Sequence, residues 1–296
     1  MPAIEVLGLH KRYGDFEAVK GIDFSVADGE LLAILGPNGA GKTTTVEILE
    51  GFRDRTAGQV SVLGVDPATG GRAYRERIGI VLQECGIDRY LSAREILQQQ
   101  AGYYPTPRDP DEVLQLVGLA DKGGERVKQL SGGLKRRLDV ALGLIGDPDL
   151  VFLDEPTTGF DPSARRQSWE LVSGLGKLGK TVLLTTHYMD EAQALADRII
   201  VIAAGQVVAE GTPDTIGGRD TAAVHIRFAL PEGLGAADVP LAASVDRGFA
   251  VIQTAEPTRD LHELTGWALD RGVELADLSV DRPSLEDVYL ELTSDG

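Results

Sequence analysis

One stretch of the sequence, GPNGAGKTT, combines glycines, a lysine and threonines at the spacing of a phosphate-binding loop. It fits the pattern G-x-x-x-x-G-K-[ST] without a mismatch, and glycines let backbone N–H groups turn toward a β-phosphate. Lys42 would supply charge to the β- and γ-phosphate oxygens, and the Thr43 hydroxyl could bind Mg²⁺. The pattern therefore predicts a nucleotide site formed by Gly36, Pro37, Asn38, Gly39, Ala40, Gly41, Lys42, Thr43 and Thr44.

Two adjacent carboxylates in DLVFLDEP could complete this chemistry. Asp154 ends a nearly continuous apolar run, and from the carboxyl edge of such a strand it could reach the water shell of Mg²⁺. Glu155 is expected to point the other way, because neighbouring side chains alternate along a strand. We assign Glu155 to orienting and activating the attacking water.

A second stretch, LSGGLKRR, has the composition of another phosphate-binding helix start. A serine and two glycines run directly into a basic helical pattern, about ninety residues after the first loop. Because the first loop is already a full nucleotide cradle, the residues alone leave open what this second one holds.

Strands and helices must hold these residues in place. The strand LLAIL leads into the glycine loop and KTTTVEILEGF has helical spacing, which is the strand–loop–helix order that such a loop requires. Residues 91–146 have a helical pattern that Pro105, Pro107 and Pro110 interrupt. Three βα-type units are then predicted, beginning with DLVFLDEP, TVLLTTH and RIIVIAAGQVVAEG.

The pattern changes after residues 211–220, GTPDTIGGRD, which are predicted to be a linker. Strands are expected at AAVHIRFAL, FAVIQT and VELADLSV, and helices at DLHELTGWALDRG and SLEDVYLEL. In the last helix, Leu285, Val288 and Tyr289 share one face. We therefore expect domains at 1–218 and 219–296, the second a small α+β module.

Composition limits the class of protein. The net charge of the 296 residues is −17, and residues 221–296 hold 14 acidic residues and five arginines, which argues against a nucleic-acid binder. The single cysteine, Cys85, excludes an intramolecular disulfide. No signal-peptide pattern and no apolar run of about 18–20 residues is present. We expect a soluble, cytosolic polypeptide whose membrane role, if any, depends on a partner.

Several motifs occur in a fixed order along residues 4–216: the glycine loop, Gln83 after the strand in IVLQE, LSGG, the DE pair and His187 after LLTTH. Together they closely resemble the ATP-binding subunit of ATP-binding cassette (ABC) transporters. The resemblance implies an α/β P-loop ATPase with a mixed sheet core, an antiparallel β part and a helical part near residues 86–146. It also implies an enzyme that hydrolyses ATP with Mg²⁺.

The resemblance also assigns roles by position. Tyr13 in KRYG matches the aromatic that stacks on adenine, and His187 matches the histidine that contacts the γ-phosphate. Gln83 matches the residue that senses Mg²⁺ and water, so the implied metal set is Thr43, Gln83 and Asp154 and the implied catalytic set is Glu155, His187 and Gln83. Asp161 in TTGFDP matches the loop that links two sites across a dimer.

In this family two ATPase domains pack head to tail, so the signature residues Ser131, Gly132 and Gly133 would bind the γ-phosphate of an ATP held mainly by the partner. This gives the second cradle a ligand and requires a second ATPase domain, with a second copy of this chain expected. Leu134 stands where the family usually has glutamine, which puts a polar contact to ribose in doubt. Phe160 replaces a frequent leucine.

Within the family, LSGGLKRR and the ending RPSLEDVYLEL look most like daunorubicin/doxorubicin-type drug-exporter ATPases. The implied complex includes a separately encoded membrane permease, contacted through residues 84–95, which would hold the chain at the cytoplasmic face of the membrane. The alternatives are an importer ATPase, a non-transport ABC ATPase that acts on ribosomes or DNA, and a small-molecule kinase that shares only the glycine loop. The sequence does not specify the transported compound.

Overall fold

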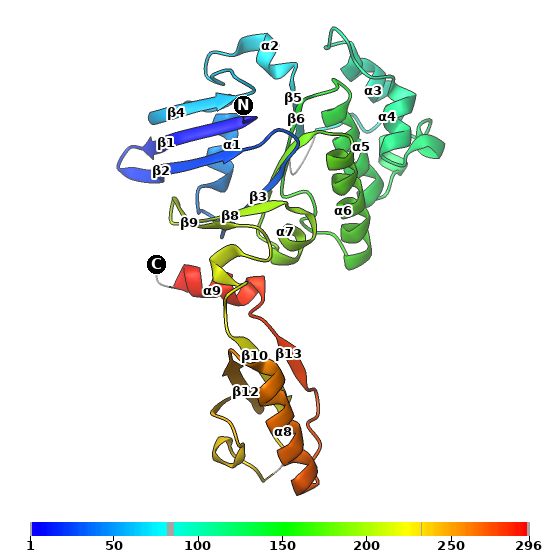
Figure 1. The fold of residues 1–296 in the computed structure, drawn as a ribbon. Coiled ribbons are helices and arrows are strands. Elements are labelled where there is room, and N and C mark those ends of the chain that lie inside the picture. Colours follow the sequence, from blue (N-terminus) through cyan, green and yellow to red (C-terminus); the bar gives the residue numbers. More distant parts are fainter. Residues whose placement is uncertain (1, 82–85, 232, 295–296) are drawn as a thin grey trace. The chain divides into compact units, whose positions relative to one another are not determined.

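The computed structural model describes residues 2–81, 86–231 and 233–294. The chain divides into two compact units, one ending at Pro213 and the other beginning at Asp214. The first unit contains a three-stranded antiparallel sheet and a six-stranded mixed sheet (Figure 1). The order of the small sheet is β2 (Phe16–Val26), β1 (Ile4–Tyr13) and β4 (Ala57–Val62). The order of the large sheet is β5 (Ile78–Val81), β6 (Leu150–Asp154), β7 (Thr181–Thr186), β3 (Leu31–Leu35), β8 (Arg198–Ala203) and β9 (Gln206–Gly211).

The large sheet brings the predicted chemistry to one edge. Strands β6, β7 and β3 are parallel neighbours, with Asp154 opposite Thr185 and Leu35 opposite Thr186. They are buried on both faces, which explains why the middle of each strand sequence is apolar. Because parallel strands end at the same edge, the glycine loop, the acidic pair and His187 all follow strand ends that lie together.

The third predicted βα-type unit is wrong. Strands β8 and β9 form an antiparallel hairpin in which Ala203 pairs with Gln206. Ala204 and Gly205 form the turn with φ of +48° and +83°, the signature of a tight hairpin turn. Two residues cannot hold a crossover helix, so the chain reverses direction and β9 becomes the edge strand of the sheet.

Four helices described in the first unit, α3, α4, α5 and α6, begin at side chains that cap them. Ser92 and Glu95 form a capping box at α3, Asp109 caps α4 just before Pro110, and Asp161 caps α6 just before Pro162. Pro110 thus starts a helix after the predicted proline-rich break. The helical elements of this unit are α1 (Lys42–Leu49), α2 (Gly71–Arg75), α3 (Ala93–Ala101), α4 (Pro110–Leu116), η1 (Ala120–Lys122), η2 (Val127–Gln129), α5 (Gly132–Leu144), α6 (Pro162–Lys177) and α7 (Met189–Leu195).

The main core of the first unit joins its two sheets. Side chains from β1 and β2, among them Leu9 and Ile22, belong to the same buried cluster as Ile34, Phe152 and Leu183 of the large sheet. The cluster also includes Leu49 of α1. The helix that follows the glycine loop is therefore held in place by burial of its apolar face.

The second unit is a four-stranded antiparallel sheet with helix α8, in the strand order β11-β12-β10-β13. Ile226, Phe228 and Ile252 alternate with more exposed residues and pack with Leu264 of α8 in a separate core. The elements of this unit are η3 (Ile216–Gly218), β10 (Val224–Ala229), η4 (Ala236–Asp238), β11 (Ala243–Asp246), β12 (Phe249–Thr254), α8 (Pro257–Arg271), β13 (Ser279–Asp281) and α9 (Leu285–Ser294).

Two features of this unit differ from the sequence expectation. Strand β11 was not predicted, although Arg247 and Gly248, with φ of +48° and +87°, form the kind of hairpin turn that a glycine signals. The stretch predicted as a linker contains η3, whose Ile216 is fully buried and which contacts α9. In α9 the three residues predicted to share a face are all buried: Leu285, Val288 and Tyr289.

No helix in the described part of the chain has both the length and the apolar character needed to cross a bilayer.

Candidate functional site

The glycine loop between β3 and α1 is shaped by the packing of its own chain. A Cβ atom at Gly36 would lie 2.2 Å from the carbonyl oxygen of Ile202. Gly41, the residue before α1, has φ of +103°, and a Cβ there would lie 2.6 Å from the carbonyl oxygen of Ala18. Glycine is therefore required at both ends of the loop. Pro37, Asn38 and Gly39 between them are exposed, as the binding of an outside group requires.

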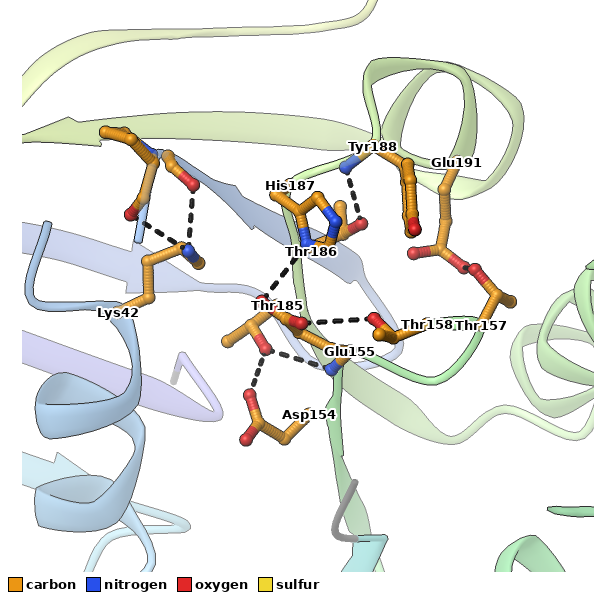
Figure 2. Close-up of polar contacts among 12 residues, drawn as sticks. Lys42, Asp154, Glu155, Thr157, Thr158, Thr185, Thr186, His187, Tyr188 and Glu191 are labelled. Carbon is orange, nitrogen blue, oxygen red and sulfur yellow. Dashed lines mark hydrogen bonds and ion pairs between the residues drawn. The ribbon is translucent and has the colours of Figure 1, made fainter. Parts of the chain in front are cut away.

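Lys42 lies inside this loop rather than in solvent. Its side chain is buried, and Nζ donates to the carbonyl oxygens of Gly36 at 2.8 Å and Pro37 at 3.2 Å (Figure 2). Burial lowers the pKa of Lys42, and the negative charges of Glu155 and Asp154 oppose that shift. The ammonium group thus lies between the loop and the acidic pair. It can exchange its two carbonyl acceptors for phosphate oxygens at the same place.

The acidic pair lies at the end of β6, but its two side chains are separated by a turn and not by strand alternation. Asp154 is the last strand residue, and its Oδ1 accepts a hydrogen bond from the Thr185 hydroxyl. Glu155 has left the strand with φ of +43°, a region that non-glycine residues rarely adopt. Its N–H donates to the carbonyl oxygen of Thr185 at 3.1 Å. The expected divergence of the two carboxylates is present, with a different cause.

His187 faces Glu155 from the end of β7 (Figure 2). Nδ1 of the ring lies 3.2 Å from Oε1 of Glu155, although within the described residues this contact does not have hydrogen-bond geometry. The other carboxylate oxygen, Oε2, accepts from the Thr158 hydroxyl at 3.1 Å. A carboxylate held on one side with an imidazole beside it suits a general base and a second group that contacts the same substrate.

Thr185 was not predicted as a site residue. Its hydroxyl donates to Asp154 and accepts from the N–H of Glu155 at 3.2 Å, so one side chain orients both carboxylate-bearing residues. The sequence signal was the hydroxyl residue two positions before His187 in TTH, which strand burial alone would not select. Thr185 acts by orienting Asp154 and Glu155 through hydrogen bonds, and the sequence pattern alone does not reveal such contacts.

A third carboxyl lies near the acidic pair, at the end of α1. Glu50 is buried, and burial raises its pKa to about 8, with the charges of Asp154 and Glu47 acting in the same direction. Its neutral form is therefore favoured close to the site. This group was also missed, because its position after an apolar helix gives no chemical signal.

Tyr13 lies at the end of β1 and is 40% exposed, so one face of its ring can accept a base. Lys11 Nζ lies 5.0 Å and the Arg53 guanidinium carbon 5.3 Å from the ring centroid. Arg53 also pairs with Glu47 of α1 at 2.5 Å. The ring is thus connected to the helix that follows the glycine loop.

The signature residues form a second cluster, which does not include Lys42 or Glu155. Ser131 precedes α5, and its hydroxyl accepts from the N–H of Leu134 at 3.4 Å. Gly132 and Gly133 have no described atom within 4 Å of where a Cβ would lie, apart from their own helix turn. The cluster lines a hollow of about 480 Å³ formed by Ser131, Gly132, Gly133, Leu134, Arg137, Thr158, Gly159, Phe160, Asp161, Ser163, Ala164 and Gln167.

The structure therefore groups the described predicted residues into two separate clusters. Asp161 lines the signature hollow and caps α6 through the N–H groups of Ser163 and Ala164, at 2.8 and 2.9 Å. Leu134 and Phe160, the two departures from the family pattern, line the same hollow and make part of it apolar. Gln83, predicted to sense the metal, lies outside the described residues.

The donor set near Lys42 suits a hard divalent cation. Asp154 offers a carboxylate, and Thr43 is exposed at the first turn of α1. Among the described residues no group of three or more His, Cys, Asp or Glu side chains could hold a metal by itself. Such a sparse set fits Mg²⁺, which keeps waters and is commonly shared with substrate phosphates.

Comparison with known proteins matches both units. The family model described as ABC transporter matches residues 19–158, and the model for the C-terminal domain of ABC transporter domain-containing protein-like chains matches residues 224–284. A daunorubicin resistance ATP-binding protein of Streptomyces coeruleorubidus is 41% identical over 99% of this chain and 96% of its own length. Nod factor export ATP-binding protein I of Rhizobium meliloti is 39% identical over 98% of this chain and 88% of its own.

Solved structures match the first unit. A component of an ABC transporter complex from Clostridium perfringens has a TM-score of 0.67 and 30% identity, covering 72% of this chain and 89% of that one. A dimeric ATP-binding cassette with bound ADP and phosphate has a TM-score of 0.62 and 25% identity, covering 71% and 98%. These matches confirm the predicted fold class.

Proposed function

The chain belongs to the ABC transporter family as an ATP-binding subunit of the exporter type, and we propose that it hydrolyses ATP at sites shared between two copies of itself. It is an ATPase whose hydrolysis drives transport. In the proposed dimer, separate side chains bind the nucleotide, activate the water and complete the site from the partner copy.

In the proposed reaction, the loop from Gly36 to Thr44 holds the phosphates and Lys42 neutralises their charge. The support is that Nζ already bonds loop carbonyls from a buried position. Tyr13 stacks on the adenine, since it is an exposed aromatic ring at a strand end. These residues bind and orient the nucleotide and do not themselves move protons.

Glu155 takes a proton from the attacking water as the water approaches the γ-phosphate. His187, 3.2 Å from the same carboxylate, contacts that phosphate and keeps the water and the base aligned. Asp154 and Thr43 would hold Mg²⁺, with Gln83 as the third expected partner. When bound, the ion would neutralise charge on the β- and γ-phosphate oxygens.

The single observation that carries the shared-site proposal is the open space beside the two signature glycines. No described packing explains Gly132 and Gly133, although glycine is less favourable than alanine in a helix. Space kept at a helix start beside Ser131 suits an anion that comes from outside the chain. In a head-to-tail dimer this anion is the γ-phosphate of the ATP bound by the partner.

Mixing two inactive variants tests this. Lys42→Met removes the lysine of the glycine loop, and Ser131→Ala removes the signature hydroxyl. In a mixed dimer, one site receives the intact loop of one chain and the intact signature of the other. We expect the mixture to recover a clear part of the ATPase activity that neither variant has alone. If both groups served the same nucleotide within one chain, mixing would recover nothing.

We further propose that the dimer works with a separate membrane permease at the cytoplasmic face of the membrane and exports a small molecule. The support is the full-length similarity to a daunorubicin resistance protein and to a Nod factor export protein. The test is a pull-down of tagged Glu155→Gln protein with Mg-ATP from detergent-solubilised source cells. Recovery of a multi-span membrane protein in comparable amount supports the exporter complex, and recovery of ribosomal or DNA-repair proteins contradicts it.

A further inference from the structure

Helix α7 carries a buried carboxyl to which the reaction assigns no role. The side chain of Glu191 has no solvent exposure and lies beside the loop after β6 and the segment after β7 (Figure 2). Glu155 and His187, the pair that faces the attacking water, lie in those two segments. The position of Glu191 therefore allows it to act on both.

The first connection runs to the loop of Glu155. Oε1 of Glu191 accepts from the Thr157 hydroxyl at 2.8 Å and from the Trp169 indole N–H of α6 at 3.2 Å. Thr157 is itself fully buried and comes two residues after Glu155. A single acceptor atom thus ties this loop to α6 and α7.

The second connection runs to the segment of His187. Burial raises the pKa of Glu191, while hydrogen bonding with Thr186, Thr157 and Trp169 lowers it. Thr186 directly precedes His187, and its hydroxyl also accepts from the N–H of Tyr188 at 3.0 Å. Within the described residues, the second oxygen of Glu191, Oε2, is buried and has no hydrogen bond. An unpaired buried oxygen disfavours the charged form of Glu191, and Oε1 serves as the acceptor for its neighbours.

The backbone of Glu155 is in a strained conformation that needs support from its surroundings. A non-glycine residue at φ of +43° is strained and persists only where its surroundings hold it. The bond from Thr157 to Glu191 is a buried anchor two residues after that strained residue. Without it, the loop could relax and carry the Glu155 carboxylate away from His187.

We propose that Glu191 is a positioning residue that keeps the side chains of Glu155 and His187 in the relative positions needed for hydrolysis. It does not touch the substrate. This inference rests on the roles proposed above for Glu155 and His187, and it extends them to a residue on a different helix.

The test compares three variants of the full chain in a steady-state ATPase assay. Glu191→Met keeps the length of the side chain and removes the acceptor, and Thr157→Val removes the donor with little change of shape. We expect kcat to fall about 10- to 100-fold in each, as for other small misplacements of reacting groups. The KM for ATP should stay within about twofold, because nucleotide binding is untouched. Glu191→Gln keeps an acceptor oxygen at the same place and should lose no more than about threefold in kcat.

Combining the two changes provides a second criterion. If one bond does the positioning, the double variant Glu191→Met with Thr157→Val should be no slower than the worse single variant. Losses that multiply would contradict a shared action. If Glu191→Met does not fold, Thr157→Val still decides the matter through its kcat and KM.

A partly buried carboxyl at the other end of the same sheet is the matched control. Glu30 pairs with Arg198 at 2.7 Å just before β3, whereas the site follows the end of that strand. Glu30→Gln should lower the melting temperature and leave kcat unchanged. The proposal is overturned if Glu191→Met behaves like this control, if kcat is retained, or if the Gln variant is as slow as the Met variant. Normal turnover by Glu155→Gln would instead overturn the role of Glu155.

Discussion

At the start of α1 the glycines are required by packing within the chain, whereas at the start of α5 no described packing requires them. A Cβ at Gly36 or Gly41 would collide with the backbone oxygens of Ile202 or Ala18. At Gly132 and Gly133 it would meet open space. The first loop is thus formed within one chain, and the second keeps room for a group from outside.

The polar groups at the two helix starts differ in the same way. Lys42 is buried and bonded to its own loop, while the Ser131 hydroxyl makes one long contact, 3.4 Å, beside a hollow. The comparison shows that similar glycine-rich sequences can be complete or incomplete sites. The two cases are distinguished by the space around the glycines. A glycine that packing does not require lowers helix stability, so its presence indicates another role.

The largest expected effect is on catalysis at the first loop. Lys42→Met should reduce kcat by about 1000-fold or more, because the charge that meets the phosphates is gone. The free energy of unfolding should change by less than about 1 kcal/mol, since a buried ammonium is replaced by an apolar group of similar length. ATPase assays and urea unfolding measure the two quantities. A large loss of stability would show that the lysine holds the loop together instead.

Next in size is the effect of filling the first loop. Gly36→Ala should lower the free energy of unfolding by about 2–4 kcal/mol, because its Cβ has no space beside a backbone oxygen. Gly41→Ala should do the same through its positive φ. Urea unfolding monitored by circular dichroism tests both. Stability within about 0.5 kcal/mol of the parent would remove the claimed contrast with α5.

The two regions should also differ in their response to pH, since α1 ends on the buried carboxyl of Glu50. Its folded-state pKa of about 8 lies above the usual 4.5, so this group favours folding fully below about pH 4.5. That contribution is lost as pH rises through about 8. Relative to the parent, Glu50→Gln should therefore gain roughly 4 kcal/mol in the free energy of unfolding between pH 5 and pH 8.5.

Chemical unfolding of both proteins at several pH values, without nucleotide, measures this difference. An advantage of the Gln variant that does not grow with pH would contradict the shift assigned to Glu50. A variant at the second helix start, Ser131→Ala, serves as the control. It should follow the pH dependence of the parent.

The smallest effect is expected at the second helix start, and its sign is the informative part. Gly133→Ala should raise the free energy of unfolding by about 0.5–1 kcal/mol, because alanine favours the helix and the added Cβ meets no described atom. The same change should lower the ATPase activity, because the Cβ enters the space in which the proposed dimer would hold the partner's phosphate. Lower stability together with full activity would reverse the comparison.

Much of the candidate site could be predicted because its residues follow strand ends in a local pattern. The glycine loop, Asp154, Glu155 and His187 each come at or directly after the end of an apolar strand, and that order survives in the fold. Thr185, Glu50 and Glu191 could not be selected in this way. Each acts on residues far along the chain, through a hydrogen bond or through shared burial.

The fold was predicted where periodicity was strong and misjudged where a turn decided the outcome. Apolar strands and capped helices were evident, while the β8–β9 hairpin and strand β11 depended on two-residue turns at Ala204 and at Arg247. Short turns carry few residues, so their signal is weak beside a run of apolar side chains.

The sequence by itself determined the family, the chemistry and the need for glycine and lysine at given positions, because these depend on residue type and local spacing. Only the tertiary structure decided which glycines have other atoms of the chain packed against them and which face open space. It also decided that Glu155 is strained and that Glu191 anchors its loop. Those properties depend on distances between atoms of segments that are separate in sequence, and close packing fixes such distances only once the whole unit has folded.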